Sequence, residues 1–438
     1  MKKVLVLGAG LVSRPLVRYL LEKGFLVTVA SRTVAKAEQL IAGHERGRAV
    51  AFDIDTQPEA LDGLVAECDL AVSLLPAPRH PLVAAACLKQ RKHMVTTSYI
   101  SPAMRQLDAE ARKLDLIFLN EMGVDPGIDH MSAMQVVEEE KKKGNRLVGF
   151  VSWCGGLPAP EANDNPFGYK FSWSPKGVLT AARNGARYRR GGQLVEIPPE
   201  KLFADPALVD VPGVGKFEGY PNRDSLSYID TYGFDPNIEE MFRGTLRNLG
   251  HCELYRGLIA LGLLEDAPRQ NFGGMKYLQL MENIVGKPAK GSIKKKLGAR
   301  VAKRVIEALD YIGMFSREEV KPQQGSIMDV MAARMAEKLA YQPGERDMLI
   351  MRHDITFERP DKKRERITAL MVDYGIPDGD SSMARTVSLP AAIGVRLILE
   401  GKISLRGVWA PVKEEIYRPA LEELKQLNIG FTETRLQL

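Results

Sequence analysis

Cysteine and histidine are too scarce and too scattered in this sequence to build a disulfide framework or a metal site. The 438 residues include four cysteines and six histidines. No two cysteines form a CxxC pair, and no two histidines form an HxxxH or HxH pair. We therefore expect no metal site and no disulfide bond. Reduced thiols are typical of a cytoplasmic protein, which is the expected location.

Long apolar runs are also missing. No stretch approaches the 18 or more apolar residues that span a bilayer, and Gly8 and Gly10 interrupt the one candidate signal peptide, so neither a membrane partner nor secretion is expected. The 61 Lys and Arg against 55 Asp and Glu leave a formal charge of +6. Because no basic stripe is interleaved with aromatic residues, nucleic acid is not an expected partner.

What the sequence does contain is a repeated alternation of strand-like and helix-like segments from residue 3 to about residue 120. Short apolar runs stand at 4–7, 26–30, 49–52, 70–75, 93–96 and 116–119. The segments between them have helical periodicity. Continuous apolar strands separated by helices predict a parallel sheet covered on both faces, which is a Rossmann-type, doubly wound α/β fold.

The rest of the chain predicts a second domain and an insertion. We expect a strand at 147–153, a long Gly/Pro-rich loop from 154 to 175, helices over 266–340, and antiparallel strands at 348–357 and 366–374. This pattern divides the chain into three parts. They are a doubly wound domain at 1–125 completed by 383–438, a second α+β domain with a mixed sheet at 126–265 and 341–382, and an all-helical insertion at 266–340.

A dinucleotide fingerprint follows the first predicted strand. It consists of Gly8, Ala9, Gly10, Leu11, Val12 and Ser13. The first glycine allows the tight turn and the second lets the backbone approach a pyrophosphate, while the third position needs only a small residue such as Ser13. The strand, turn and helix context favours nucleotide binding over a purely structural glycine turn.

The end of the second strand favours NADP over NAD. The sequence there is Ser31, Arg32 and Thr33, with no carboxylate to hold a ribose 2′-hydroxyl. An arginine beside two hydroxyls suits a 2′-phosphate, although Arg32 can also be an ordinary surface charge. Asp53 and Ile54 after the third strand, and Leu74 after the fourth, are expected to contact the cofactor.

Several strings then resemble one family. They are TTSYISPAMRQLD (96–108), NEMGVDPGIDHM (120–131), CGGLPAPE (154–161), DNPFGYKFSWSPKGVL (164–179), YPNRDS (220–225) and RGTLRNLG (243–250). Together they are similar to saccharopine reductases, the NADP-dependent, glutamate-forming saccharopine dehydrogenases of the α-aminoadipate route of lysine metabolism. The resemblance runs in order from the first strand to about residue 265, and beyond it only the helix and strand pattern supports the assignment.

The resemblance implies an oxidoreductase that acts on a C–N bond. L-glutamate and 2-aminoadipate 6-semialdehyde condense to an imine, and hydride from NADPH reduces it to saccharopine. Saccharopine carries three carboxylates. Arg223 and Arg247, in strings that resemble substrate-binding segments, can each clamp a carboxylate, with a buried salt bridge as the alternative role. Thr245 and Leu246, beside Arg247, are also expected to bind the substrate.

The same resemblance places the reacting centre. It puts Thr96 and Thr97 along the cofactor, Ser98 and Tyr99 towards the substrate, and Val124, Asp125 and Pro126 between the two. The candidates for a catalytic role are Tyr99, Asp125 and Cys154, with Lys170 and Trp173 as substrate neighbours. Trp173 can equally pack in the core, and Asp129 and His130 are expected to cap and pack the following helix.

Three alternatives remain open from the sequence. The first is a related imine-reducing enzyme that takes another amine, like carboxynorspermidine synthase or lysine 6-dehydrogenase, although two arginines argue against a polyamine. The second is a non-catalytic NADP-binding sensor, which would be expected to lose Tyr99, Asp125 and the two arginines. The third, nucleic-acid binding, has the least support. The resemblance also implies a homodimer whose second-domain sheet pairs across subunits.

Overall fold

The first domain is built on a seven-stranded, entirely parallel sheet. The computed structural model describes all 438 residues, and the strand order is β17-β6-β5-β4-β1-β2-β3. The strands are β1 (Lys3–Leu7), β2 (Leu26–Ser31), β3 (Gly47–Ala51), β4 (Leu70–Ser73), β5 (His93–Thr96), β6 (Ile117–Leu119) and β17 (Gly407–Trp409). The order reverses between β1 and β4, where dinucleotides bind in this topology. The predicted doubly wound fold is confirmed.

Helices cover this parallel sheet because each strand is apolar on both faces. They are α1 (Arg14–Glu22), α2 (Val34–Ile41), α3 (Ala60–Ala66), α4 (His80–Gln90), α5 (Pro102–Arg105) and α6 (Asp108–Lys113). Helix α1 buries the apolar face that the sequence predicted, including Leu16, Val17 and Leu20. Helices α1 to α5 each follow the carboxyl end of a strand, so the loops that carry the fingerprint gather at one edge of the sheet.

The second domain is a nine-stranded mixed sheet. Its main path is β10-β11-β12-β7-β15-β16-β18, and β8 pairs with both β12 and β9. The strands are β7 (Arg146–Pro158), β8 (Ala186–Arg190), β9 (Gln193–Ile197), β10 (Ala207–Val211), β11 (Gly215–Pro221), β12 (Glu240–Arg247), β15 (Asp347–Glu358), β16 (Arg364–Tyr374) and β18 (Thr432–Gln437). Helices α7 (Ile128–Lys142), α8 (Pro175–Ala181) and α9 (Ser227–Tyr232) accompany it.

One prediction in this domain is wrong. Residues 154–158, expected to begin a loop, continue β7 as far as Pro158. The strand continues because it is central: Cys154 pairs with Thr245 of β12 on one side and with Met351 of β15 on the other. The glycines that suggested a loop serve close packing, since a Cβ at Gly155 would lie 2.8 Å from the backbone oxygen of Leu246.

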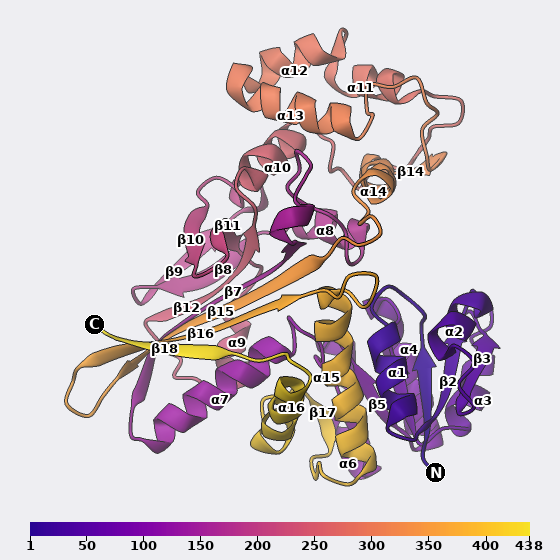
Figure 1. The fold of residues 1–438 in the computed structure, drawn as a ribbon, viewed down its shortest axis with the longest axis vertical. Coiled ribbons are helices and arrows are strands. Elements are labelled where there is room, and N and C mark those ends of the chain that lie inside the picture. The colour runs from indigo at the N-terminus through magenta and orange to yellow at the C-terminus, as the bar shows by residue number, and fades with distance from the viewer.

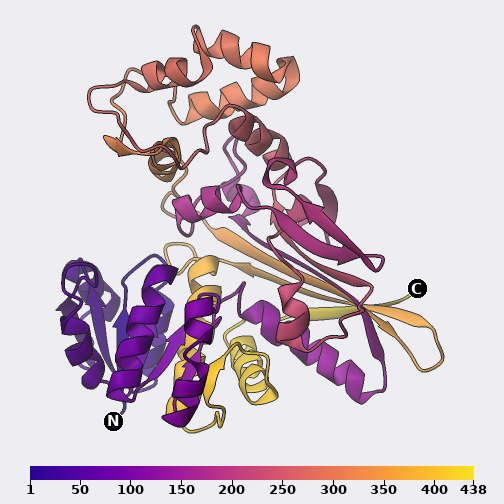
Figure 2. The same ribbon diagram turned by 180° about the vertical axis from the view of Figure 1, so that it is seen from behind.

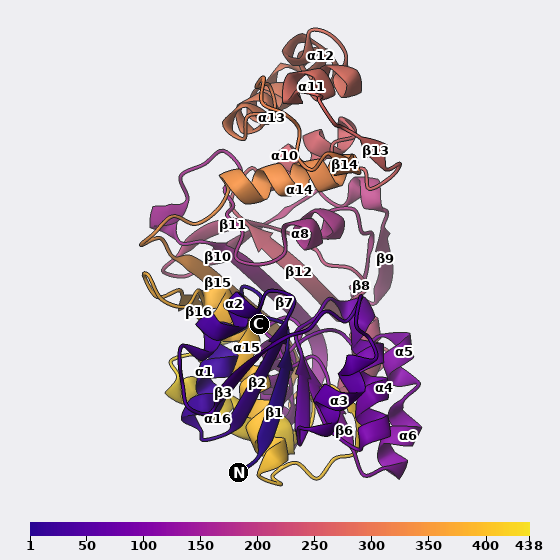
Figure 3. The same ribbon diagram turned by 90° about the vertical axis from the view of Figure 1, so that its right-hand side faces the viewer.

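A helical segment forms the end of the molecule farthest from the first domain (Figure 1). It comprises α10 (His251–Ala260), α11 (Tyr277–Val285), α12 (Ala289–Leu297), α13 (Ala299–Tyr311) and α14 (Ile327–Lys338), with a small hairpin of β13 (Gln270–Asn271) and β14 (Gln324–Gly325). Its apolar residues belong to a cluster of 38 buried residues, which also includes Phe167, Tyr169 and Val178 of the second domain. Figure 3 shows three tiers along the long axis: the parallel sheet, the mixed sheet and the helices.

After the mixed sheet the chain returns to the first domain, except for its last strand. Helices α15 (Ser382–Leu399) and α16 (Glu414–Gln426) flank β17, which pairs with β6 and so completes the parallel sheet. The last strand, β18, instead pairs with β16 of the second sheet. Assigning all of 383–438 to the first domain is therefore wrong for residues 432–437, because the free edge of β16 provides their hydrogen-bond partners.

Helix α15 also tests the expectation that no segment could span a membrane. Its 18 residues have a mean hydropathy of 1.3, so by length and composition alone the helix could cross a membrane. However, 78% of these residues are buried inside the protein. The helix packs against α1 and α16. One apolar cluster of 57 buried residues includes side chains of the parallel sheet, α7, α15 and the mixed sheet, so the two domains share a core. Figure 2 shows the backbone of the two domains from behind. α15 is therefore a core helix.

Candidate active site

The fingerprint loop forms a turn closed by Ser13. The Gly10 N–H donates to the Ser13 hydroxyl at 3.0 Å, and that hydroxyl donates to the Gly8 carbonyl at 3.3 Å. Gly8 has a φ of +114°, and a Cβ there would lie 3.1 Å from the Leu74 oxygen. Gly10 has open space where a Cβ would stand. The loop therefore leaves room for a pyrophosphate at the start of α1, beside Ala9, Leu11 and Val12.

The neighbouring strand ends fit the adenosine side of an NADP molecule. Arg32 is exposed and makes no ion pair, while the Ser31 hydroxyl accepts from the Thr33 N–H at 3.3 Å. The Asp53 carboxylate accepts from the Asp55 N–H at 3.0 Å, which shapes the turn that holds Ile54. A free guanidinium beside two hydroxyls matches a 2′-phosphate, so the residues present fit this cofactor.

A histidine that the sequence analysis missed connects the ends of β4 and β5. His80 has one ring nitrogen 2.9 Å from the Ser73 hydroxyl and the other 2.8 Å from the Ser98 hydroxyl, with Thr96 at 3.3 Å. Burial lowers the pKa of His80 to about 4, so the ring is neutral at physiological pH. It fixes the orientation of Ser98 at the point where cofactor and substrate are expected to meet.

The segment after β5 lies against the segment after β6. The Met122 N–H donates to the Thr96 carbonyl at 3.1 Å, and the Glu121 N–H donates to the Ser98 carbonyl at 3.1 Å. Thr97 lies near Gly123, where an added Cβ would be 3.4 Å away. This pairing brings Thr96, Thr97, Ser98 and Tyr99 beside Val124, Asp125 and Pro126, as the resemblance implied.

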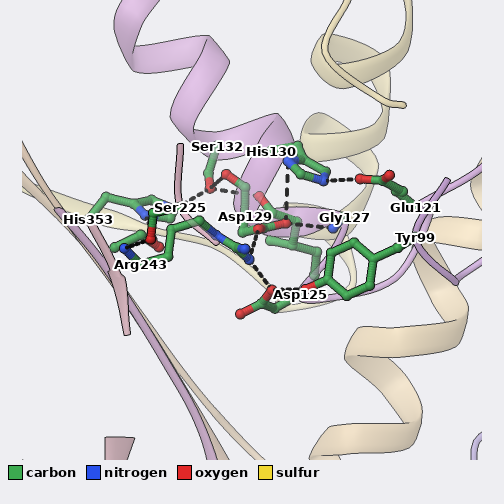
Figure 4. A network of polar contacts seen from close by, with 12 residues as sticks. Tyr99, Glu121, Asp125, Gly127, Asp129, His130, Ser132, Ser225, Arg243 and His353 are labelled. Atoms are coloured by element: carbon green, nitrogen blue, oxygen red, sulfur yellow. Dashed lines mark hydrogen bonds and ion pairs between the residues drawn. The ribbon is translucent and has the colours of Figure 1, made fainter. Parts of the chain in front are cut away.

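Asp125 is at the centre of the site. It accepts a hydrogen bond from the Tyr99 hydroxyl at 3.2 Å and one from the Arg243 guanidinium (Figure 4). Arg243 is buried and also donates to Asp129 at 2.9 Å. Burial, with Asp125 next in effect, raises the pKa of Tyr99, so its hydroxyl stays protonated. The hydrogen bond between Asp125 and Tyr99 joins two residues that the resemblance placed at the reacting centre, whereas Arg243 was not anticipated because nothing local distinguishes it from Arg247.

His130 and Glu121 form a second ion pair, in addition to that of Arg243 and Asp125. The His130 ring lies 2.7 Å from the Glu121 carboxylate and 2.8 Å from the Tyr232 hydroxyl. Burial alone would lower the pKa of His130, but Asp129 and Glu121 outweigh it and raise that pKa. The expectation that Asp129 and His130 only cap and pack α7 is thus incomplete. Asp129 accepts from Gly127 N–H near the start of α7, and it also holds Arg243.

The register of the mixed sheet gathers the remaining candidates on one face. Arg243, Thr245 and Arg247 alternate along β12, so their side chains share a face. Cys154 lies opposite Thr245, and burial raises the pKa of its thiol well above the usual range, which keeps it neutral. Leu246 points to the other face and is buried in the apolar cluster of Trp153 and Phe242.

Lys170 and Trp173 are already engaged within the protein. The Lys170 ammonium is buried and pairs with Glu345 at 2.6 Å and with Asp164 at 2.9 Å. The Trp173 indole donates to the Tyr169 hydroxyl at 3.1 Å and packs between two apolar clusters. The predicted substrate contact by Lys170 therefore has to compete with two carboxylates, which single-sequence reasoning could not reveal because Glu345 is 175 residues away.

The two predicted carboxylate clamps differ in their surroundings. Arg223 is exposed, lies 5.7 Å from the Tyr99 ring centroid, and lines a cavity of about 800 Å³. Arg247 is buried, lies 5.1 Å from the Tyr169 ring centroid, and pairs with no carboxylate. The alternative, a structural salt bridge, is absent at both positions. Arg223 is thus beside Tyr99, which also lines a groove of about 1000 Å³, and Arg247 is four residues after Arg243 on β12.

No group of three or more His, Cys, Asp or Glu side chains in the chain is arranged to hold a metal ion. All four cysteines are free thiols. The polar residues described above are therefore suited to binding, orientation and electrostatic stabilisation at a site beside the switch point of the parallel sheet.

Comparisons with known proteins agree with this arrangement. The model of the saccharopine dehydrogenase NADP binding domain matches residues 4–119, and that of the saccharopine dehydrogenase C-terminal domain matches residues 123–429. The second match includes helices α11 to α15, for which the sequence alone showed only the helix and strand pattern.

Individual relatives match over the whole chain. The chain is 38% identical to the saccharopine dehydrogenase [NADP(+), L-glutamate-forming] of Pyricularia oryzae, covering 97% of both chains. It is 39% identical to the mitochondrial alpha-aminoadipic semialdehyde synthase of Bos taurus, covering 98% of this chain and 47% of that protein. The crystal structure of apo saccharopine dehydrogenase (L-Glu forming) from Saccharomyces cerevisiae matches with a TM-score of 0.90 and 36% identity, covering 100% of both chains. This chain therefore belongs to the saccharopine dehydrogenase family, and its parallel-sheet domain is the NADP-binding domain of that family.

Proposed function

We propose that this protein is an NADP-dependent, glutamate-forming saccharopine dehydrogenase. It interconverts saccharopine with L-glutamate and 2-aminoadipate 6-semialdehyde. The observation that carries the proposal is that two guanidinium groups without carboxylate partners are positioned near Asp125. Arg223 lies beside the ring of Tyr99, whose hydroxyl donates to Asp125, and Arg247 is four residues after Arg243, the ion-pair partner of Asp125, on β12. This charge pattern complements a substrate that has carboxylates at its ends and a cationic nitrogen between them.

Asp125 supports the reaction through its charge. Condensation of the glutamate amine with the aldehyde releases water and leaves a protonated imine, and NADPH supplies the hydride that reduces its carbon to the secondary amine. The buried cluster of Glu121, Asp125 and Asp129 holds three carboxylates, which pair with Arg243 and with the His130 ring. Its net negative charge stabilises the cationic imine in a site of low dielectric constant.

Positioning accounts for the other contributions. The hydroxyl of Tyr99 donates to Asp125 and holds that carboxylate in place. His80 fixes the hydroxyl of Ser98, and the raised pKa of Cys154 leaves a neutral thiol, unsuited to act as a thiolate base. Hydride transfer to an imine requires orientation and electrostatic stabilisation more than a nucleophile, which suits a site of this composition.

The test is turnover of saccharopine by the purified protein, with NADP and NAD compared and glutamate measured as the product. We expect NADPH to form in a saccharopine-dependent reaction with one glutamate released per NADPH, and a much slower reaction with NAD. If the protein binds NADPH but neither cofactor supports turnover, the proposal fails, and a different amine substrate or a sensor role takes its place.

We also propose that the protein works as a homodimer in the cytoplasm. The support for the dimer is β18, an edge strand of the second sheet whose six residues are all exposed, because an unpaired edge offers its backbone to another strand. The support for the cytoplasm is the four free thiols. Light scattering during gel filtration tests the dimer, and a monomeric mass at micromolar concentration contradicts it.

A further inference from the structure

The segment that carries Tyr99 has little regular structure to hold it. Residues 97–100 lie between β5 and α5, outside any helix or strand, and the backbone N–H and C=O of Tyr99 make no hydrogen bond. The groove of about 1000 Å³ borders Tyr99 and Ile100, so apolar packing supports this segment on its other side only. The position of the Tyr99 hydroxyl therefore depends on hydrogen bonds made by its neighbours in the chain.

Glu121 makes hydrogen bonds to both of these neighbours. Its backbone N–H donates to the Ser98 carbonyl at 3.1 Å, and its side-chain Oε1 accepts from the Ile100 N–H at 2.8 Å. The Ser98 carbonyl belongs to the peptide unit before Tyr99, and the Ile100 N–H belongs to the peptide unit after it. Because peptide units are planar and rigid, one residue fixes the backbone on both sides of Tyr99.

The carboxylate of Glu121 is itself held by His130. Its Oε2 lies 2.7 Å from Nε2 of the buried His130 ring (Figure 4), and Nδ1 of that ring lies 2.8 Å from the Tyr232 hydroxyl. Burial alone would raise the pKa of Glu121, but the hydrogen bond and the charge of His130 outweigh it and lower that pKa. The carboxylate is therefore charged, and a charged acceptor makes a stronger hydrogen bond to the Ile100 N–H than a neutral one does.

The backbone of Glu121 is strained. Its φ is +60°, in the left-handed region that favours glycine. A glycine at this position would relieve the strain, but it would provide no carboxylate for Ile100 and His130. A long charged side chain at a strained position beside a reacting centre indicates a role that outweighs the local cost.

We propose that Glu121 is a positioning residue of the reaction, which holds Tyr99 so that its hydroxyl orients Asp125. This inference rests on the proposed function, because it takes Tyr99 and Asp125 as part of the reacting centre. The Tyr99 hydroxyl donates to Asp125 at 3.2 Å, and a shift of either flanking peptide unit would lengthen that hydrogen bond. Both side-chain oxygens of Glu121 are already occupied, so its effect on the reaction passes through Tyr99.

The test is the variant Glu121→Asp. It keeps the negative charge, and aspartate tolerates the left-handed backbone, but its side chain is one methylene shorter and cannot reach Ile100 and His130 together. In saccharopine oxidation we expect kcat to fall at least tenfold while the KM for NADP changes less than twofold. Glu140→Asp is the matched control and should keep the wild-type kcat, because Glu140 is also buried but pairs with Lys143 and Arg435 near the other end of α7. An unchanged kcat in Glu121→Asp would overturn the proposal.

A double-variant cycle separates positioning from a structural role. In a Tyr99→Phe background, which has no hydroxyl to orient Asp125, Glu121→Asp should change the remaining kcat less than twofold. A general structural defect, or a direct effect of Glu121 on the substrate, would instead lower kcat by the same factor in both backgrounds, and that result overturns the proposal.

Glu121→Gln gives a second, independent variant. It keeps the length of the side chain, but its single amide oxygen can accept from only one of the two donors, Ile100 and His130. We expect a fall in kcat that Tyr99→Phe again suppresses in large part, and an equal fall in both backgrounds contradicts the positioning role. These outcomes apply while wild type remains active, since absence of wild-type turnover would overturn the proposed function instead.

Discussion

The ring of His80 connects Ser73 at the end of β4 to Ser98 in the segment after β5, with Nε2 of the ring 2.8 Å from the Ser98 hydroxyl. The two serines are 25 positions apart in the chain and lie on neighbouring parallel strands and their extensions. The ring therefore links the end of β4 to the segment that follows β5.

Replacing His80 should slow the reaction because Ser98 loses its hydrogen-bond partner. We expect His80→Ala to lower kcat/KM by roughly tenfold, because the Ser98 hydroxyl loses its fixed orientation, and to lower the unfolding free energy by about 1–3 kcal/mol because buried hydroxyls lose a partner. Steady-state kinetics on His80→Ala, Ser98→Ala and the double variant measure the coupling. If the two effects on kcat/KM are simply additive, the two residues act independently.

Asp125 should act through its charge. Replacing it in Asp125→Asn keeps a hydrogen-bond acceptor for Tyr99 but removes the negative charge beside the imine. We expect kcat to fall about 100-fold, with a small change in the KM for NADPH. Arg243 keeps its second partner Asp129, so the fold should persist, which circular dichroism can check. A loss of less than about tenfold with an unchanged pH profile would show that the charge is not needed.

Arg32 should select the 2′-phosphate of the cofactor. The structure leaves its guanidinium exposed and without an ion pair at the end of β2. We expect Arg32→Ala to raise the KM for NADPH at least tenfold and to leave the KM for NADH nearly unchanged. Arg48→Ala, on the adjacent strand β3 and paired with Glu67, is the matched control. Equal changes for both cofactors would remove Arg32 from the specificity site.

His130 should make stability fall as the pH rises. Its pKa in the folded protein is raised above the usual 6.5, since Asp129 and Glu121 outweigh burial. The folded state therefore holds a proton that the unfolded state has lost, and this contribution is complete below about pH 6.5 and disappears as the pH rises through the folded pKa. The difference in unfolding free energy between wild type and His130→Gln, measured in urea, should shrink from pH 6 to pH 9.

The pKa of His353 is shifted in the direction opposite to that of His130. It is also buried, between the hydroxyls of Ser132 and Ser152, and burial lowers its pKa to about 4. Its contribution is complete above about pH 6.5 and declines as the pH falls towards 4, because the unfolded chain gains the proton first. The effect of His353→Gln should therefore shrink towards acid, and the same pH trend for both variants would contradict the charge assignments.

The sequence alone was sufficient to predict the features that depend on residues close together in the chain. Gly8 forms the tight turn of the nucleotide loop because its φ of +114° favours glycine, and the apolar runs predicted six of the seven strands of the parallel sheet within a few residues, all except β17. The strings around Tyr99, Asp125 and Arg247 were sufficient to indicate the family, whose models match both parts of the chain.

The partners of the charged side chains could be identified only from the tertiary structure. Arg243 and Arg247 look alike in the sequence, yet the register of β12 and β7 places one on Asp125 and leaves the other without a carboxylate. Lys170 was expected near the substrate but pairs with Glu345. Strand β18 was expected in the first domain but pairs with β16 of the second sheet. The physical reason is the same in each case: ion pairs and strand pairs form between segments far apart in the chain, so their partners are set by packing and not by local pattern.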